Sequence, residues 1–90
     1  MSTMTASPLD DTADVPAAAR SVRFHATAAG PGLWRLIDVR GLVVGHLRRV
    51  PAPHGDRFRV ERYHPGSRSF RVLGEFWSCA QAVECLRFAR

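Results

Sequence analysis

Long apolar runs are missing from this 90-residue sequence, and cysteine is scarce. A membrane-spanning helix needs about 18 uninterrupted apolar residues, and no segment comes near that length, so we expect a soluble chain that makes no membrane contact. On a helix, Cys79 and Cys85 would be about 9 Å apart in rise, beyond the roughly 7 Å over which a disulfide joins two α-carbons. The first residues also lack the basic start and apolar core of a secretory signal. These absences predict a cytoplasmic protein with reduced thiols.

Compact motifs of enzymes and metal sites are also absent from the sequence. The four histidines, His25, His46, His54 and His64, do not have tight metal-ligand spacing, and the two cysteines do not form a CxxC arrangement. There is no glycine-rich phosphate loop, nucleophile elbow or paired-carboxylate motif. We therefore expect no catalytic residue, no metal and no cofactor.

Charge and composition divide the chain into two regions. Residues 1–19 contain three aspartates and no basic residue, whereas residues 20–90 contain all 13 arginines against five acidic residues. The first region is rich in Ala, Ser, Thr and Pro, which is typical of disorder. We predict a disordered, acidic and Ala-rich tail over residues 1–30 and a folded domain over residues 31–90. Alternation in residues 22–25 leaves open a short edge strand within the tail.

Turn-forming residues divide the folded region into strands. Asp38 in first place and Gly41 in fourth favour a type I turn, which would join residues 33–37 and 42–49 as a hairpin. Pro65 and Gly66 favour a type II turn over residues 64–67, which would join residues 57–63 and 69–76. Ser78 followed by Gln81 indicates a capping box, so a helix should run from there nearly to residue 90. The sequence thus predicts an α+β fold: a small antiparallel four-stranded sheet of two hairpins, with one C-terminal helix packed on one face.

Strand alternation then assigns side chains to the two faces of this sheet. If Ile37 pairs with Leu42, the helix-facing core consists of Trp34, Leu36, Val43, Gly45, Leu47, Phe58, Val60, Phe70, Val72, Gly74 and Phe76. The helix contributes Cys79, Ala82, Val83 and Leu86 at helical spacing. The opposite face would hold five arginines, Arg35, Arg48, Arg57, Arg59 and Arg71. It would also hold five aliphatic residues, Leu33, Ile37, Leu42, Val44 and Leu73.

A face that mixes guanidinium groups with aliphatic side chains indicates a binding surface. The planar fork of arginine suits phosphate oxygens and the acceptor edge of guanine, so the five arginines are candidate DNA-binding residues. Alternatively, the five aliphatic residues form the centre of a homodimer or protein interface, with the arginines as its rim. A solvated face also remains open, because the sequence contains no lysine and a coding bias could impose such arginine usage.

The segment L-G-E-F-W-S-C-A-Q-A, from Leu73 to Ala82, resembles the L-G-x-F-x-[ST]-x-x-[EQ]-A segment of the ethylene-response-factor type DNA-binding domain. It is also similar to the strand-to-helix step in the arm-type DNA-binding domains of phage integrases. In those families a three-stranded sheet backed by a helix lays its exposed face in the major groove and reads it with Arg and Trp. The resemblance covers about ten residues and implies that Arg57, Arg59 and Arg71 read DNA. The whole chain is also similar to small uncharacterised actinobacterial proteins, which implies no activity.

Overall fold

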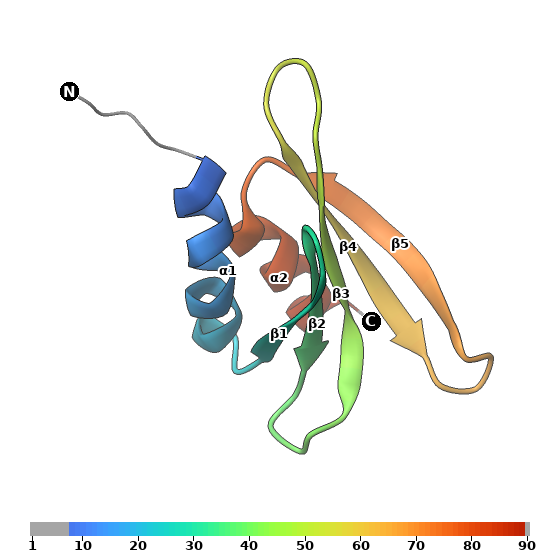
Figure 1. Cartoon of the computed structure of the whole chain (residues 1–90). Helices are drawn as coiled ribbons and strands as arrows, with labels where there is room; N and C mark the ends of the chain where they lie inside the picture. Colours follow the sequence, from blue (N-terminus) through green and yellow to red (C-terminus); the bar gives the residue numbers. More distant parts are fainter. Residues whose placement is uncertain (1–7, 90) are drawn as a thin grey trace.

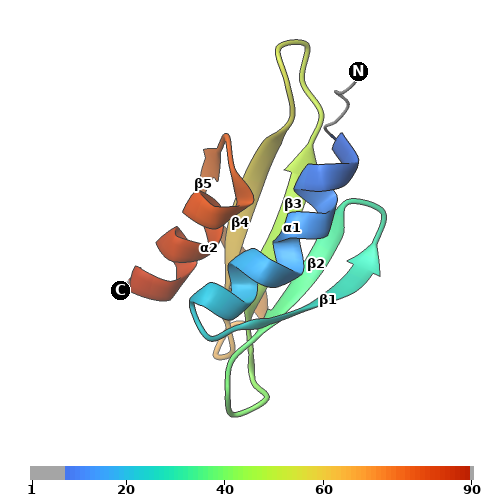
Figure 2. The same ribbon diagram turned by 90° about the vertical axis from the view of Figure 1, so that its left-hand side faces the viewer.

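Two helices lie on one face of a five-stranded antiparallel sheet in the computed structural model, which describes residues 8–89 (Figure 1). The elements in chain order are α1 (Pro8–Ser21), β1 (His25–Gly30), β2 (Leu33–Ile37), β3 (Val43–Val50), β4 (Arg57–His64), β5 (Ser69–Phe76) and α2 (Cys79–Phe88). Successive strands are neighbours in the sheet. Figure 2 shows α1 and α2 beside each other in front of the sheet, so the other face of the sheet is open.

The predicted α+β class, the antiparallel sheet and the C-terminal helix are confirmed. The predicted number of elements is wrong, because the sheet has five strands instead of four and is covered by two helices instead of one. The additional elements, α1 and β1, occupy a segment in which we expected a disordered tail. The expectation of disorder is therefore wrong for these two elements. The first part of the predicted tail, residues 1–7, lies outside the described residues.

Helix α1 joins the fold through a narrow apolar stripe. Val15 and Ala19 of α1 are four positions apart, and both are buried in the common core together with Val22 and Phe24 of the segment that follows the helix. Alanine has the highest intrinsic helix propensity, so an Ala-rich segment needs only a few buried side chains to be held as a helix against a sheet. The composition of this segment indicated disorder, but the spacing of these residues was the signal of a helix.

The two predicted hairpins form, but their turns differ in how well they follow the prediction. In the first, the Gly41 amide donates to the Asp38 carbonyl oxygen at 2.9 Å, which confirms a turn at this position. In the second, the Arg68 amide donates to the Pro65 carbonyl oxygen at 3.3 Å, and the positive φ angle of 53° is that of Arg68, not of Gly66. The predicted type II turn over residues 64–67 is therefore wrong, because the turn lies one residue further along.

Helix α2 begins where the capping signal predicted. The Ser78 hydroxyl oxygen accepts a hydrogen bond from the Gln81 amide at 3.2 Å, which satisfies one of the free amides at the helix start. Its predicted apolar stripe is buried, and so are most of the predicted sheet residues. The buried core consists of Val15, Ala19, Val22, Phe24, Trp34, Leu36, Leu47, Phe58, Val60, Cys79, Ala82, Val83 and Leu86. Within the described residues, neither helix has the length and apolarity needed to cross a membrane.

Candidate nucleic-acid interface

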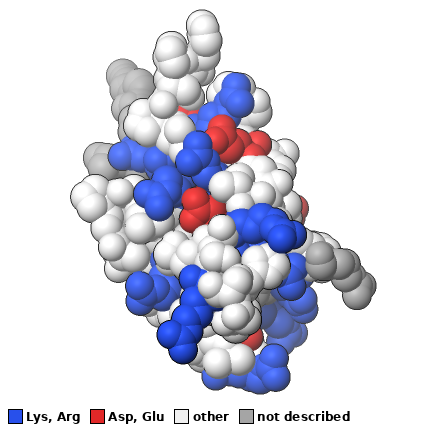
Figure 3. Space-filling model, turned by 90° about the vertical axis from the view of Figure 1, so that its right-hand side faces the viewer, with Lys and Arg blue, Asp and Glu red and all other residues white. Residues whose placement is uncertain are grey.

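The sheet face that points away from the helices, here called the outer face, is defined by the register of the strands. Paired residues of antiparallel strands point to the same side of a sheet. One row across the outer face consists of Thr27, Arg35, His46, Glu61 and Val72, and a second consists of Leu33, Arg48, Arg59 and Glu75. Two further pairs, Val50 with Arg57 and Tyr63 with Phe70, also lie on it. Figure 3 shows this side of the molecule, with basic side chains interspersed among uncharged and acidic ones.

A β-bulge decides which side chains of β5 reach the outer face. Val60 pairs with Gly74, but the next residue of β4, Glu61, pairs with Val72, so Leu73 is an extra residue in β5. An extra residue reverses the alternation of side chains along the rest of a strand. The side of the sheet on which each residue from 69 to 73 lies is therefore the opposite of what uninterrupted alternation gives.

This reversal corrects four assignments made from the sequence. Phe70 and Val72 were expected in the core, but they lie on the outer face and are 40% and 53% exposed. Arg71 was expected on the outer face, but it pairs with Arg62 on the helix side of the sheet. Leu73 was expected beside it, but packs against the core. This reversal therefore removes Arg71 and Leu73 from the outer face and adds Phe70 and Val72 to it.

Three rings form a stacking cluster, here defined as His46, Tyr63 and Phe70, at the β3–β5 side of the outer face. The His46 and Phe70 ring centroids are 4.1 Å apart with an interplanar angle of 16°, so the two rings are stacked. Tyr63 leans on Phe70 with centroids 5.0 Å apart and an angle of 46°. Phe70 stays accessible, so one exposed phenyl ring is held in place by two neighbouring rings.

The His46 ring is held in its neutral form. Burial lowers its pKa from the ordinary 6.5, because the charged form is poorly solvated at this position, and the nearby Arg35 and Arg48 lower it further. Glu61, whose carboxylate lies 3.9 Å from His46 Nδ1, acts in the opposite direction but is outweighed. At neutral pH the stacking cluster is therefore uncharged.

The guanidinium groups around this cluster are partly neutralised by two carboxylates. Arg59 Nε donates to Glu75 Oε2 at 2.9 Å, and Arg59 Nη2 lies 2.8 Å from the same oxygen. Arg48 Nε lies 4.0 Å from Glu61 Oε2, while Arg35 is exposed on the neighbouring strand. Of the five predicted DNA-binding arginines, the structure brings Arg35, Arg48, Arg57 and Arg59 together on this face, beside the two carboxylates.

Arg57 occupies a different environment at the start of β4. Its guanidinium carbon lies 4.1 Å from the ring centroid of Trp77, in a cation–π contact, and Trp77 is 57% exposed. Arg57 Nε is buried with no hydrogen-bond partner among the described residues. The guanidinium group is thus fixed on an exposed indole ring at one edge of the outer face, away from the stacking cluster.

The five residues of the alternative interface do not form one patch. Leu33 and Ile37 are half-buried on β2, and Leu42 is exposed at the β2–β3 turn. Val44 and Leu73 pack against the core instead, and each is the extra residue of a β-bulge. Ile37 pairs with Val43, not with Leu42 as predicted, so Val44 has no partner in β2. The exposed apolar surface of the sheet lies on β5 instead, at Phe70 and Val72.

Sequence reasoning missed the stacking cluster, although the sequence contained a signal for it. Counting outward from the second turn, once it is placed at residues 65–68, pairs Tyr63 with Phe70, whereas counting back from the start of α2 pairs Phe58 with Phe76. Both pairings occur in the structure. They are compatible only if one strand holds an extra residue, so the two counts together predict a bulge.

Within the described residues, no three of the His, Cys, Asp and Glu side chains lie close enough together to hold a metal ion. Comparison with known proteins found no protein family, curated protein or solved structure that matches this chain. The geometry of the outer face is therefore the basis for a functional assignment.

Proposed function

We propose that this protein is a cytoplasmic, non-catalytic binding module whose outer face binds nucleic acid, and that the favoured form is a single strand. The observation that supports this proposal is the exposed ring of Phe70, stacked on neutral His46, which has the guanidinium groups of Arg35 and Arg48 nearby. Single-strand binding proteins combine exposed aromatic rings, on which bases stack, with basic side chains that follow the phosphates. The cytoplasmic location is the expectation carried over from the sequence.

The width of the sheet favours a single strand over a duplex. Neighbouring strands lie about 4.8 Å apart, so five strands span roughly 19 Å, whereas the major groove of B-DNA is about 12 Å wide. The major-groove mode of the three-stranded domains that the sequence resembles does not extend to this sheet as a whole. An open platform with accessible rings instead suits unpaired bases, whose faces are free to stack.

Each side chain then has a distinct expected role. A base stacks on Phe70, and Val72 beside it gives apolar contact to a sugar or a second base. Arg35 and Arg48 contact phosphate oxygens, because they are on neighbouring strands, Arg35 is exposed and the Arg48 side chain is 43% exposed. Arg59 is ion-paired with Glu75, so we expect it to offer hydrogen-bond donors in a fixed position but little net positive charge.

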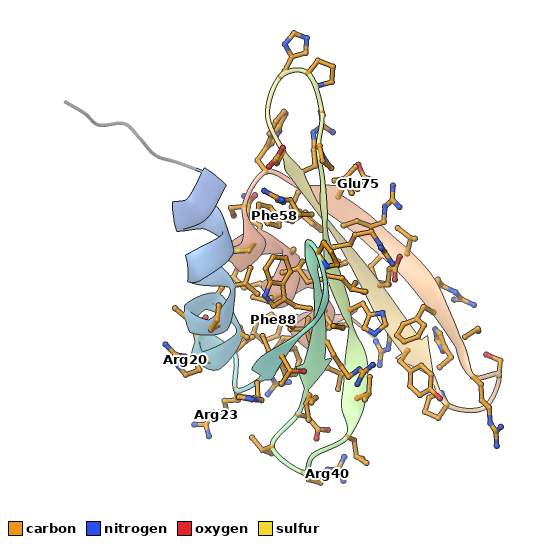
Figure 4. The ribbon with its side chains drawn as sticks, in the orientation of Figure 1. Arg20, Arg23, Arg40, Phe58, Glu75 and Phe88 are labelled. Carbon is orange, nitrogen blue, oxygen red and sulfur yellow. The ribbon has the colours of Figure 1, made fainter. Side chains whose placement is uncertain are left out.

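Fluorescence anisotropy with a labelled oligothymidine and with a duplex of equal length tests this proposal. Base stacking on an aromatic side chain contributes about 1–3 kcal/mol, so Phe70→Ala should weaken oligothymidine binding about 5- to 150-fold. Phe88→Ala is the matched control, because Phe88 is an exposed phenylalanine of α2 (Figure 4). Equal losses in both variants, or tighter binding of the duplex than of the single strand, would contradict the proposal.

Salt dependence separates the phosphate contacts from the stacking. Each phosphate neutralised on a single strand contributes about −0.7 to the slope of log K against log salt, so Arg35→Ala should flatten the slope by about that amount. Arg20→Ala removes an equal charge from α1 (Figure 4) and should leave the slope unchanged. A slope near zero for the unmodified protein would exclude phosphate contacts.

A second candidate function is self-association through β5, and it rests on a separate observation. This strand is at the edge of the sheet and presents the exposed Phe70 and Val72. Exposed apolar edge strands are templates for pairing with another chain. Sedimentation velocity of the protein without nucleic acid distinguishes the two functions, since self-association requires a concentration-dependent dimer that Val72→Lys dissociates.

A further inference from the structure

A cavity of about 370 Å³ lies at the end of the sheet where α2 ends. It is bounded by the α1–β1 connection, the β2–β3 turn, the end of β4 and the last turn of α2. Apart from Tyr63, which also belongs to the stacking cluster, the residues that line it have no part in the proposed function. Figure 4 labels two of its residues, Arg23 and Arg40, at the same end of the molecule.

Four arginines line this cavity, and one carboxylate opposes them. The arginines are Arg23, Arg40, Arg62 and Arg87, and the carboxylate is that of Asp38. Asp38 Oδ1 already accepts hydrogen bonds from the amides of Arg40 and Leu42, at 2.9 and 3.0 Å. The Leu42 hydrogen bond is the main reason that the pKa of Asp38 is lowered. This carboxylate is thus engaged by the turn, and the lining has a surplus of three positive charges.

A hydrogen bond anchors one of the four arginines, and a second lies at a strained backbone position. Arg62 Nη1 donates to the Ala89 carbonyl oxygen at 3.0 Å, which anchors this half-buried guanidinium at the end of α2. Arg23 has a φ angle of 67° in the turn that ends α1, a conformation that favours glycine and costs other residues about 1 kcal/mol or more. Arg23 therefore lies beside the cavity in a backbone conformation that glycine would adopt at lower cost.

Apolar side chains form the rest of the lining. Phe24 and Leu86 are buried in the core and border the cavity, and Val43 and Tyr63 also line it. A cavity of this volume is at the lower end of the range for small-molecule sites, which combine apolar walls with a few polar groups that fix orientation. Its lining therefore suits a ligand with a ring-sized body and a strongly anionic group.

We propose that this cavity binds a phosphate monoester carried on a ring-sized body, such as a nucleotide. A phosphate monoester carries a charge of about −1.5 to −2 at neutral pH, and its oxygens match the planar fork of arginine. The ring would lie against Phe24 and Leu86, and the phosphate among the four guanidinium groups. The same chemistry is offered by a free nucleotide and by the phosphorylated end of a strand.

Titration of the ¹⁵N-labelled full chain with uridine 5′-monophosphate tests this proposal, with uridine and inorganic phosphate as matched probes. We expect saturable amide shifts around residues 38–44, 62 and 87. Affinity for the monophosphate should be about 10-fold or more above that for either probe, because both parts of the ligand are needed. No saturable shift at millimolar concentration, or equal affinity for uridine, would overturn the proposal.

Arg23→Gly is the decisive variant, because it removes a guanidinium group and also relieves the positive φ angle, so the fold is retained. It should melt at an unchanged or higher temperature and bind the monophosphate about 10-fold more weakly. Arg20→Ala, which lies outside the lining, should bind as the unmodified protein does. If a double variant that carries both Arg23→Gly and Arg40→Ala binds the monophosphate with unchanged affinity, the proposed site is refuted.

The two sources of the ligand are separated with a short oligothymidine that carries either a 5′-phosphate or a 5′-hydroxyl. Tighter binding of the phosphorylated strand, lost in Arg23→Gly, assigns the cavity to a strand end. Equal binding of both strands, with the monophosphate still bound, assigns it to a free nucleotide. The Phe70→Ala variant distinguishes failure of the cavity from failure of the outer face. In this variant the cavity should bind the monophosphate with unchanged affinity, even if the outer face binds no strand.

Discussion

Gly45 on β3 is the position where the fold tolerates a side chain least. A β-carbon built there would overlap the carbonyl oxygen of Glu61 in β4 and would lie 3.0 Å from Cδ2 of Leu86 in α2. The Glu61 carbonyl oxygen belongs to the backbone, so it cannot move away by a change of rotamer as the end of a flexible side chain can. Gly45→Ala therefore requires β4 or β3 to move at a point where α2 packs closely against the sheet.

The magnitude of this effect follows from the cost of overpacking. Inserting a methyl group into a packed core costs about 1–3 kcal/mol, and a backbone obstacle places Gly45→Ala at or above about 3 kcal/mol. A domain of this size has a total stability of only about 4–12 kcal/mol. Since each kcal/mol shifts the melting temperature of a small domain by about 4–8 °C, we expect a loss of at least about 12 °C.

Thermal unfolding followed by circular dichroism measures this loss, with Gly66→Ala as the matched control. A β-carbon at Gly66 would meet no atom within 4 Å, and its φ angle is not positive. The control should be neutral or slightly stabilising, because alanine restricts the unfolded chain. Equal melting temperatures for the two variants would refute the close approach of β3, β4 and α2 that the fold requires.

Three further predictions concern α1, α2 and the stacking cluster. Val15→Ala should lower the free energy of unfolding in urea by about 1–3 kcal/mol, because Val15 is fully buried; no effect would show that α1 does not belong to the core. Ser78→Ala should cost about 0.5–2 kcal/mol through loss of the hydrogen bond that caps α2, whereas Ser67→Ala in an exposed turn should not. His46 should titrate below 6.5 in NMR spectra. Because its folded-state pKa is below the unfolded value, it contributes stability above pH 6.5 that is lost as the pH falls through the folded pKa, and His46→Asn should remove that loss.

The sequence predicted the elements whose boundaries are marked by specific residues. Asp38 and Gly41 marked one turn, and Ser78 with Gln81 marked the start of α2, because both signals depend on local backbone hydrogen bonds. Helix α1 was not predicted, because the amino-acid composition of its segment is typical of disorder, whereas the spacing of its apolar residues is typical of a helix. Val15 and Ala19 are both fully buried, four positions apart, in a segment that composition alone classed as disordered.

The candidate site could be predicted only in part, because strand register is a non-local property. Four arginines reached the outer face as predicted, since uninterrupted alternation holds through β2, most of β3 and the first half of β4. The bulge at Leu73 then moved Arg71 to the other side and brought Phe70 out. A single extra residue in an edge strand does not change the local amino-acid composition, so composition cannot predict it. In this sheet it replaced an arginine on the outer face with an exposed aromatic ring.

Chemical-shift mapping with an unlabelled oligothymidine tests the central claim most directly. We expect amide shifts that saturate with added strand and that fall on β3, β4 and β5 around His46, Tyr63 and Phe70, while residues of α1 stay unchanged. Shifts confined to the helix side, or no shifts at low salt, would contradict the assignment of the outer face as a surface that binds single-stranded nucleic acid.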